Sequence, residues 1–150
     1  MKKIIYLLLA LGLLILLLFL LKECPCAAPQ RAIVSINGIE ISVEVANTYI
    51  KHRKGLSGRE SLPKDEGMLF VFDKPGLYEF WMKEMNFPID IVWIGEDKRV
   101  VFIKENATPE SFPELLHPSL PALYVIETNA GFVKEHKISV GDTTEFTLSQ

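Results

Sequence analysis

The sequence predicts a mainly β fold, and three observations support that prediction. Short apolar segments recur from residue 32 onward, and several of them alternate apolar with polar residues. Turn residues separate these segments, most clearly Asn37-Gly38, which is typical of a two-residue hairpin. Only two stretches have a helical pattern, and both are short. We therefore expect a compact antiparallel β-sandwich or flattened barrel with two short helices, preceded by an N-terminal transmembrane helix.

Residues 1–23 are predicted to be a membrane anchor or signal segment. Lys2 and Lys3 precede eighteen uncharged residues, and a helix of that length spans about 27 Å, close to the hydrocarbon thickness of a bilayer. Basic residues at the front indicate a cytoplasmic N-terminus and an extracytoplasmic domain. Cleavage after Ala28 would leave Pro29 first, a poor signal-peptidase site. We expect a single-pass, signal-anchored cell-membrane protein, the alternative being secretion after signal cleavage.

Residues 24–31 form a linker that contains both cysteines of the chain, Cys24 and Cys26. The domain itself has no cysteine, so no disulfide framework stabilises it. Under the predicted topology the two thiols lie at the outer membrane surface. There they are inert linker residues, acylation sites, or the means of forming a disulfide-linked dimer. Two thiolates without a neighbouring histidine supply half of a zinc shell, which argues against a metal site.

The exported domain is predicted to span residues 32–150 and to open with a hairpin of residues 32–36 and 39–46. Asn47 or Thr48 can cap a helix over residues 49–54, and Gly55 would end it. Further strands are expected at residues 67–72, 77–82, 89–94, 100–104, 122–128 and 144–148, and a second short helix follows Gly131.

Residues 67–94 contain the most apolar part of the domain. In its first strand Met68, Phe70 and Phe72 point one way and the residues between them the other, so both faces are apolar, as in a strand buried on both sides. The run 73–76, Asp-Lys-Pro-Gly, predicts a turn. In the strand 89–94, alternation places Asp90 on an otherwise apolar face.

Composition and motifs exclude several classes of function. After residue 23 the chain has 13 Lys and Arg against 18 Asp and Glu. This balance argues against a nucleic-acid surface, because contacts to phosphates need clustered Lys and Arg side chains. It has no glycine-rich phosphate loop and no Gly-x-Ser-x-Gly elbow. Its three histidines are scattered without a metal-ligand spacing. We expect no cofactor and no metal, and we assign no catalytic residue.

Several short motifs occur in an order that resembles the "domain of unknown function 192" family, over about residues 42–147. The motifs are Arg53-Lys54-Gly55-Leu56, Arg59, Leu62-Pro63, Asp65 to Phe70, Phe80 to Lys83, Pro88 to Ile91, Glu127 to Gly131 and Val140 to Asp142. The resemblance implies a compact β-rich domain, often exported in prokaryotes, with no established activity. Ser57, and the run 83–86, depart from the family's usual residues, so a pocket lined by them would have its own ligand preference.

The candidate binding residues are charged side chains and one tryptophan near the apolar block: Arg53, Arg59, Glu66, Trp81, Lys83, Asp90 and Glu127. A carboxylate on an apolar face is costly unless it is paired. We therefore expect Asp90 to be buried and to form an ion pair with Lys83, Arg53 or Arg59. The pair would either fix the sheet or belong to a ligand site. In that site the arginines would bind a carboxylate or hydroxyl-rich ligand, and Trp81 would supply an aromatic surface.

These observations favour a non-catalytic small-ligand-binding or accessory module. One alternative is a hydrolase that uses carboxylates of the loop and strands, such as Asp65 and Glu66. Another is an envelope interaction or assembly protein. A pocket that joins Asp90, Lys83 and Arg53 would favour ligand binding, facing carboxylates would favour the hydrolase, and a flat apolar patch would favour assembly.

Overall fold

The computed structural model describes Gly12 and residues 29–148. Apart from Gly12, the predicted anchor lies outside the described residues, and so do Cys24 and Cys26. In the part of the chain that is described, no helix is both long enough and apolar enough to cross a membrane.

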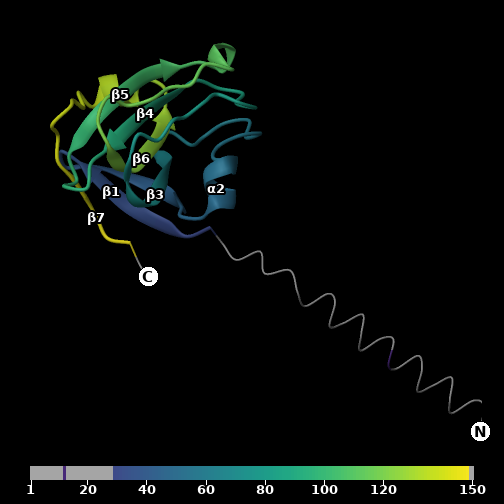
Figure 1. Ribbon diagram of the computed structural model, residues 1–150, viewed down its shortest axis with the longest axis horizontal. Helices are drawn as coiled ribbons and strands as arrows, with labels where there is room; N and C mark the ends of the chain where they lie inside the picture. Colours follow the sequence, from purple (N-terminus) through teal and green to yellow (C-terminus); the bar gives the residue numbers. More distant parts are fainter. Residues whose placement is uncertain (1–11, 13–28, 149–150) are drawn as a thin grey trace, which may run out of the picture.

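The domain is mainly β, with two short α-helices (Figure 1). Its elements are β1 (Arg31–Ile36), β2 (Ile39–Ala46), α2 (Tyr49–Lys54), β3 (Glu66–Gly76), β4 (Ile89–Ile94), β5 (Val100–Ala107), η1 (Pro109–Ser111), β6 (Ala122–Asn129), α3 (Phe132–Glu135) and β7 (Thr144–Phe146). The predicted hairpin and both predicted helices are confirmed. Asn37 and Gly38 have positive φ angles, as a two-residue hairpin turn requires.

All seven strands belong to one sheet, in the order β5-β4-β6-β3-β2-β1-β7. Neighbours are antiparallel except β2 and β3, which run parallel because α2 and the loop after it return the chain to the same end of the sheet. The sheet curls into a half-barrel whose edges meet at one end, where Arg99 and Thr143 form an isolated bridge. A sandwich of two sheets is therefore not formed; one curled sheet takes its place.

Each face of the sheet is covered by a hydrophobic cluster. On what we call the α3 face, Leu69, Val92 and Ile126 pack with Phe132 and Val133 of α3. On the opposite face, the loop face, the sheet is covered by the connecting segments around residues 55–62, 80–87 and 107–116. The alternation predicted for β3 and β4 is confirmed. Phe70, Ile91 and Trp93 lie on the loop face, and the residues next to them lie on the α3 face.

Two predictions in the central block are wrong. Residues 73–76 belong to the end of β3, beyond an irregularity after Val71, and do not form a separate turn. Residues 77–82 are not a strand, although their apolar residues alternate. They leave the sheet and cross its loop face, with one isolated bridge between Phe80 and Leu116. Alternation alone cannot distinguish a strand from an extended covering segment, because only the former has a neighbour for its backbone groups.

Candidate functional site: an aromatic pocket with an acidic floor

A pocket of about 450 Å³ opens on the loop face, between α2, β3 and the covering segment 77–85. Six aromatic side chains line it: Tyr49, Phe70, Phe72, Tyr78, Phe80 and Trp81. Its charged or ionisable residues are His52, Arg53, Lys54, Glu79 and Glu127. The pocket is therefore mainly apolar, with few polar groups at defined positions, as small-molecule sites usually are.

The aromatic walls are fixed by mutual packing. The rings of Phe72 and Tyr78 stack with centroids 3.5 Å apart and planes 8° apart. Phe80 packs edge-on against Phe70 at 4.9 Å and against Trp93 at 5.6 Å. Trp93 Nε1 also donates a hydrogen bond of 2.9 Å to the Tyr78 carbonyl, which ties the covering segment to β4. These contacts give the pocket a defined shape before any ligand arrives.

Glu127 of β6 forms the floor of the pocket. It lies opposite Met68 of β3 and Ile91 of β4, in the middle of the loop face. The residue is only 5% exposed. Its Oε2 is the one buried side-chain polar atom of the described residues without a hydrogen-bond partner. Burial raises the pKa of Glu127 to about 8, and the nearby Arg59 charge opposes that rise. Burial thus favours the neutral form of this carboxyl group at the floor of the pocket.

Gly55 brings the end of α2 close to this carboxyl group. Its φ is +48°, where side chains are disfavoured, and a Cβ there would lie 3.8 Å from Glu127 Oε2 and 3.4 Å from the Phe70 ring. Glycine therefore ends the helix and also leaves the space above the floor open. Thr48 begins the same helix by accepting a hydrogen bond from the Lys51 backbone N–H at 3.3 Å.

The short helix α2 supplies three basic side chains to the pocket. Arg53 lies over the Trp81 ring, with its Cζ 5.4 Å from the ring centroid. Neither Arg53 nor Lys54 has an ion-pair partner among residues 29–148. His52 Nε2 lies 2.9 Å from the Ala46 carbonyl and 3.1 Å from the Val71 carbonyl. Two acceptors around one nitrogen require that Nε2 carry a proton, so His52 anchors α2 to β2 and β3.

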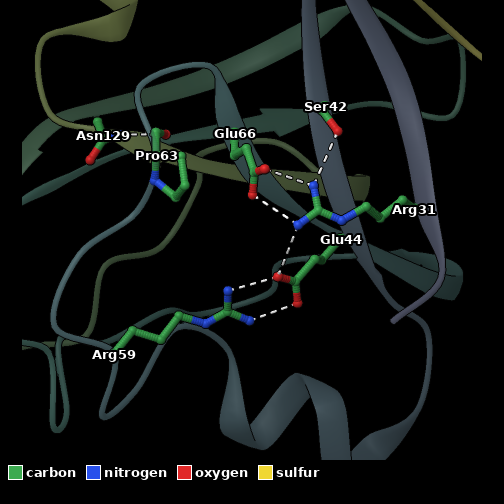
Figure 2. A network of polar contacts seen from close by, with 7 residues as sticks. All are labelled: Arg31, Ser42, Glu44, Arg59, Pro63, Glu66 and Asn129. Carbon is green, nitrogen blue, oxygen red and sulfur yellow. Dashed lines mark hydrogen bonds and ion pairs between the residues drawn. The ribbon is translucent and has the colours of Figure 1, made fainter. Parts of the chain in front are cut away.

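A chain of alternating charges lies beside the pocket but does not line it (Figure 2). Arg59 donates two hydrogen bonds to Glu44, at 2.8 and 2.7 Å. Arg31 donates two to Glu66, at 2.8 and 3.0 Å, and lies 3.9 Å from Glu44. The Arg59 guanidinium lowers the pKa of Glu44, and Arg31 lowers that of Glu66. Paired in this way, Arg59 and Glu66 connect the loop, β1, β2 and β3.

The prediction for Asp90 is half confirmed. Asp90 is fully buried, as expected. Its predicted ion pair with Lys83, Arg53 or Arg59 is wrong, because Asp90 lies on the α3 face and those cations lie on the loop-face side. The carboxylate oxygens accept hydrogen bonds from two backbone N–H groups, Asn106 at 2.8 Å and Val133 at 2.9 Å. Asp90 therefore fastens α3 and the end of β5 to the sheet.

Of the seven residues singled out in the sequence, the pocket brings together three: Arg53, Trp81 and Glu127. Lys83 lies near the site, with Nζ 5.9 Å from the Trp81 centroid, but its ion-pair partner is Glu84. His52 and the other five aromatic residues of the wall were not predicted from the sequence. The signal for them was a density of aromatic residues between positions 70 and 81, which was interpreted as strand core.

The described residues contain no group of three or more His, Cys, Asp or Glu side chains that could hold a metal ion.

The fold and the pocket define a small β domain, a curled half-barrel whose loop face holds an aromatic pocket above a buried acid. A family model matches residues 32–146, and the chain therefore belongs to that family, DUF192, described as "Uncharacterized ACR".

Two solved structures are similar to this chain. One is from Sinorhizobium meliloti 1021, titled a "putative transcription regulator"; it is 33% identical, with a TM-score of 0.72, and the match covers 79% of this chain and 94% of that one. The other, from Novosphingobium aromaticivorans and titled a protein of unknown function, is also 33% identical. Its TM-score is 0.74, and the match covers 81% of this chain and 89% of that one. A comparison with curated proteins found no match.

Proposed function

We propose that this domain is a non-catalytic module that binds a small molecule in the loop-face pocket. The observation that carries the proposal is the unpartnered Oε2 of Glu127 at the floor of a mainly apolar pocket. A buried polar atom without a partner costs about 1–3 kcal/mol. A ligand that supplies the missing hydrogen bond removes that cost, so the pocket is complementary to a ligand with one polar group at its buried end.

The alternatives from the sequence have less support. The hydrolase hypothesis rested on carboxylates of the loop and strands. Of these, Glu127 of β6 lines the pocket, but neither Asp65 nor Glu66 does. Glu66 is held by Arg31 instead. The assembly hypothesis needs a flat apolar patch, whereas the apolar side chains of Tyr49, Phe72 and Trp81 next to α2 line a pocket. An acid with a shifted pKa in a cleft is also typical of catalytic sites, so the test below measures both binding and turnover on the same variants.

The test is a ligand-observed NMR screen of a small-molecule library against the full chain in mild detergent. Three proteins are compared: wild type, Glu127→Leu, and the control Glu66→Gln, which alters a carboxylate outside the pocket. We expect compounds that bind wild type and the control but not the Leu variant. The proposal is wrong if no compound depends on Glu127. If Glu127-dependent compounds are converted to products, the module is an enzyme.

We further propose that the module is held at the outer side of the cell membrane by its N-terminal segment. The support is the run of eighteen uncharged residues behind Lys2 and Lys3. After expression in bacteria, the full chain should stay in the membrane pellet through a carbonate wash. A soluble product that begins near Pro29 would instead show cleavage of a signal peptide.

A further inference from the structure

The charges of the pocket are arranged along its depth. Glu127 is at the floor, buried and neutral, while Arg53 and Lys54 are exposed residues of α2 at the mouth. Between them lie the aromatic walls. A molecule that occupies the pocket from mouth to floor therefore meets cations first, rings next and a neutral acid last.

The two cations at the mouth have no ion-pair partner in the described part of the chain, whereas Arg31 and Arg59 each have a bidentate partner. The mouth also has one carboxylate, that of the exposed Glu79. The exposed mouth thus has two cations against one carboxylate, so its net charge is positive. Arg53 is, in addition, packed over the Trp81 ring, which holds its guanidinium near the mouth. This arrangement favours an anionic group there.

The middle of the pocket favours a ring. Phe70 and Phe80 meet edge to face, and Phe72 and Tyr78 form a stacked pair. Aromatic rings bind well to such surfaces by stacking or edge-to-face contact. The volume of about 450 Å³ is at the small end of the range for ligand pockets, so one ring with short substituents suits it better than a chain or a fused system.

The floor favours a neutral hydrogen-bonding group over a charged one. A ligand carboxylate at the floor would be an ionised group buried away from the cations at the mouth, a cost that one hydrogen bond from the protonated Glu127 does not offset. An ammonium there would have to keep Glu127 ionised in the apolar site, with the Arg59 charge also nearby. A hydroxyl group can accept from or donate to a carboxyl group without any change of charge.

From this arrangement we infer that the pocket takes an aromatic carboxylate, or a similar small aromatic anion, with its anionic group at Arg53 and Lys54 and a hydroxyl group at Glu127. The inference rests on the proposed function, because it names the class of ligand for the same pocket.

The experiment uses three matched probes: 3-(4-hydroxyphenyl)propanoate, 3-(4-hydroxyphenyl)propan-1-ol and 3-(4-hydroxyphenyl)propylamine. They share ring and hydroxyl and differ only in the charge of the other end. Binding to the full chain in mild detergent is measured by titration calorimetry and NMR. The affinity of the carboxylate should exceed that of the amine by about tenfold or more, as expected for one charge-assisted contact. The affinity of the alcohol should lie between the two.

Variants locate the charge selectivity. Arg53→Gln combined with Lys54→Gln should remove most of the preference for the carboxylate and leave binding of the alcohol nearly unchanged. Lys134→Gln, an exposed cation of α3 outside the pocket, is the matched control and should keep the preference. At the floor, 3-phenylpropanoate, which lacks the hydroxyl, should bind more weakly than its hydroxylated partner to wild type and equally to Glu127→Leu.

The outcomes separate this inference from the proposed function. Tighter binding of the amine, or equal binding of all three probes, overturns the inference and leaves a ligand-binding pocket in place. A carboxylate preference that survives the double Gln substitution also overturns it, because the selectivity would then arise elsewhere. If none of the probes binds, the inference is wrong, and the library screen described above decides whether the proposed function fails with it.

Discussion

Asp90 and Glu127 are both buried carboxylic acids, and their positions on neighbouring strands differ by one step of register. Asp90 lies opposite Thr128, and Glu127 lies opposite Ile91. That one step places them on opposite faces of the sheet. On the α3 face, both oxygens of Asp90 accept hydrogen bonds from backbone N–H groups. On the loop face, Oε2 of Glu127 has no partner within the described residues.

The comparison separates two uses of a buried acid. An acid whose acceptors are all occupied connects elements of the fold, and its removal breaks those connections. An acid left unsatisfied in a pocket weakens the fold, and a ligand can compensate for that cost. The position of an acid in an apolar strand therefore does not reveal its role. The number of hydrogen-bond donors around the acid reveals that role.

The largest expected effect concerns Glu127→Gln. The unfolded carboxyl group loses its proton near pH 4.5, whereas the folded one keeps its proton up to about pH 8. The wild type therefore loses stability as pH rises between these values, and the Gln variant, which has no ionisable group there, does not. At about 1.4 kcal/mol per pKa unit, the variant should gain up to about 5 kcal/mol over wild type by pH 8.

Denaturant unfolding of both proteins from pH 4 to pH 9 measures this difference and cancels the contributions of other groups. A difference that stays constant with pH would mean that Glu127 is ionised in the folded protein and has a partner. The contrast with Asp90 would then disappear.

The next largest effect is the loss of Asp90. In Asp90→Ala two buried backbone N–H groups lose their acceptor, so unfolding should become easier by about 3 kcal/mol or more. Asp90→Asn keeps one acceptor and should lose about half as much. Denaturant melts of both variants test this. An Asn variant more stable than wild type would show that Asp90, like Glu127, lowers the stability of the fold. Asp90 would then be a second functional acid, on the α3 face.

A smaller effect is expected for the pair Arg59–Glu44. A double-mutant cycle with Arg59→Gln and Glu44→Gln should give a coupling of about 1 kcal/mol, because the pair is bidentate but only partly buried. Arg59 lowers the pKa of Glu44, so the coupling should be lost as pH falls through the folded-state pKa of Glu44, below its usual 4.5.

The same variant sharpens the contrast between the two acids. Arg59 is the charge that opposes the rise of the Glu127 pKa. In Arg59→Gln the pH-dependent transition assigned to Glu127 should move to higher pH. A transition that does not move would mean that the Arg59 charge does not reach the floor of the pocket.

The smallest effect is predicted for Glu66→Ala. Glu66 pairs with Arg31 at the surface, where solvent screens the pair and the chain entropy of two long side chains opposes it. The denaturation midpoint should not move measurably at any pH between 5 and 9. A clear loss of stability would show that the charge network of Figure 2 acts as one unit.

The sequence predicts those parts of the fold that depend on local chemistry. Asn37-Gly38 fixes the hairpin, and Thr48 and Gly55 fix the ends of α2. Alternation places the residues of β3 and β4 on the correct faces. The family resemblance is confirmed by the match over residues 32–146.

What sequence alone cannot supply is the pairing of faces across the sheet. Asp90 was expected to pair with Lys83, Arg53 or Arg59 because a carboxylate on an apolar strand face needs a partner. Register places them on opposite faces. The aromatic pocket was not predicted for a related reason. Residues 77–81 alternate like a strand, yet they cover the sheet and do not join it. In the candidate site, Arg53, Trp81 and Glu127 had been singled out from the sequence, but the other aromatic residues that line the pocket with them had not.

The meeting of the sheet's two edges has a consequence for how copies of this protein coexist. An open sheet exposes a row of unpaired backbone groups on which another chain can add a strand and begin aggregation. Here Val100 at the start of β5 donates to Asp142, and Gly141 donates back to Val100. The last strand, β7, has only three residues. The two edges thus use some of each other's backbone groups at this end, which leaves fewer of them on which a neighbouring copy could add a strand.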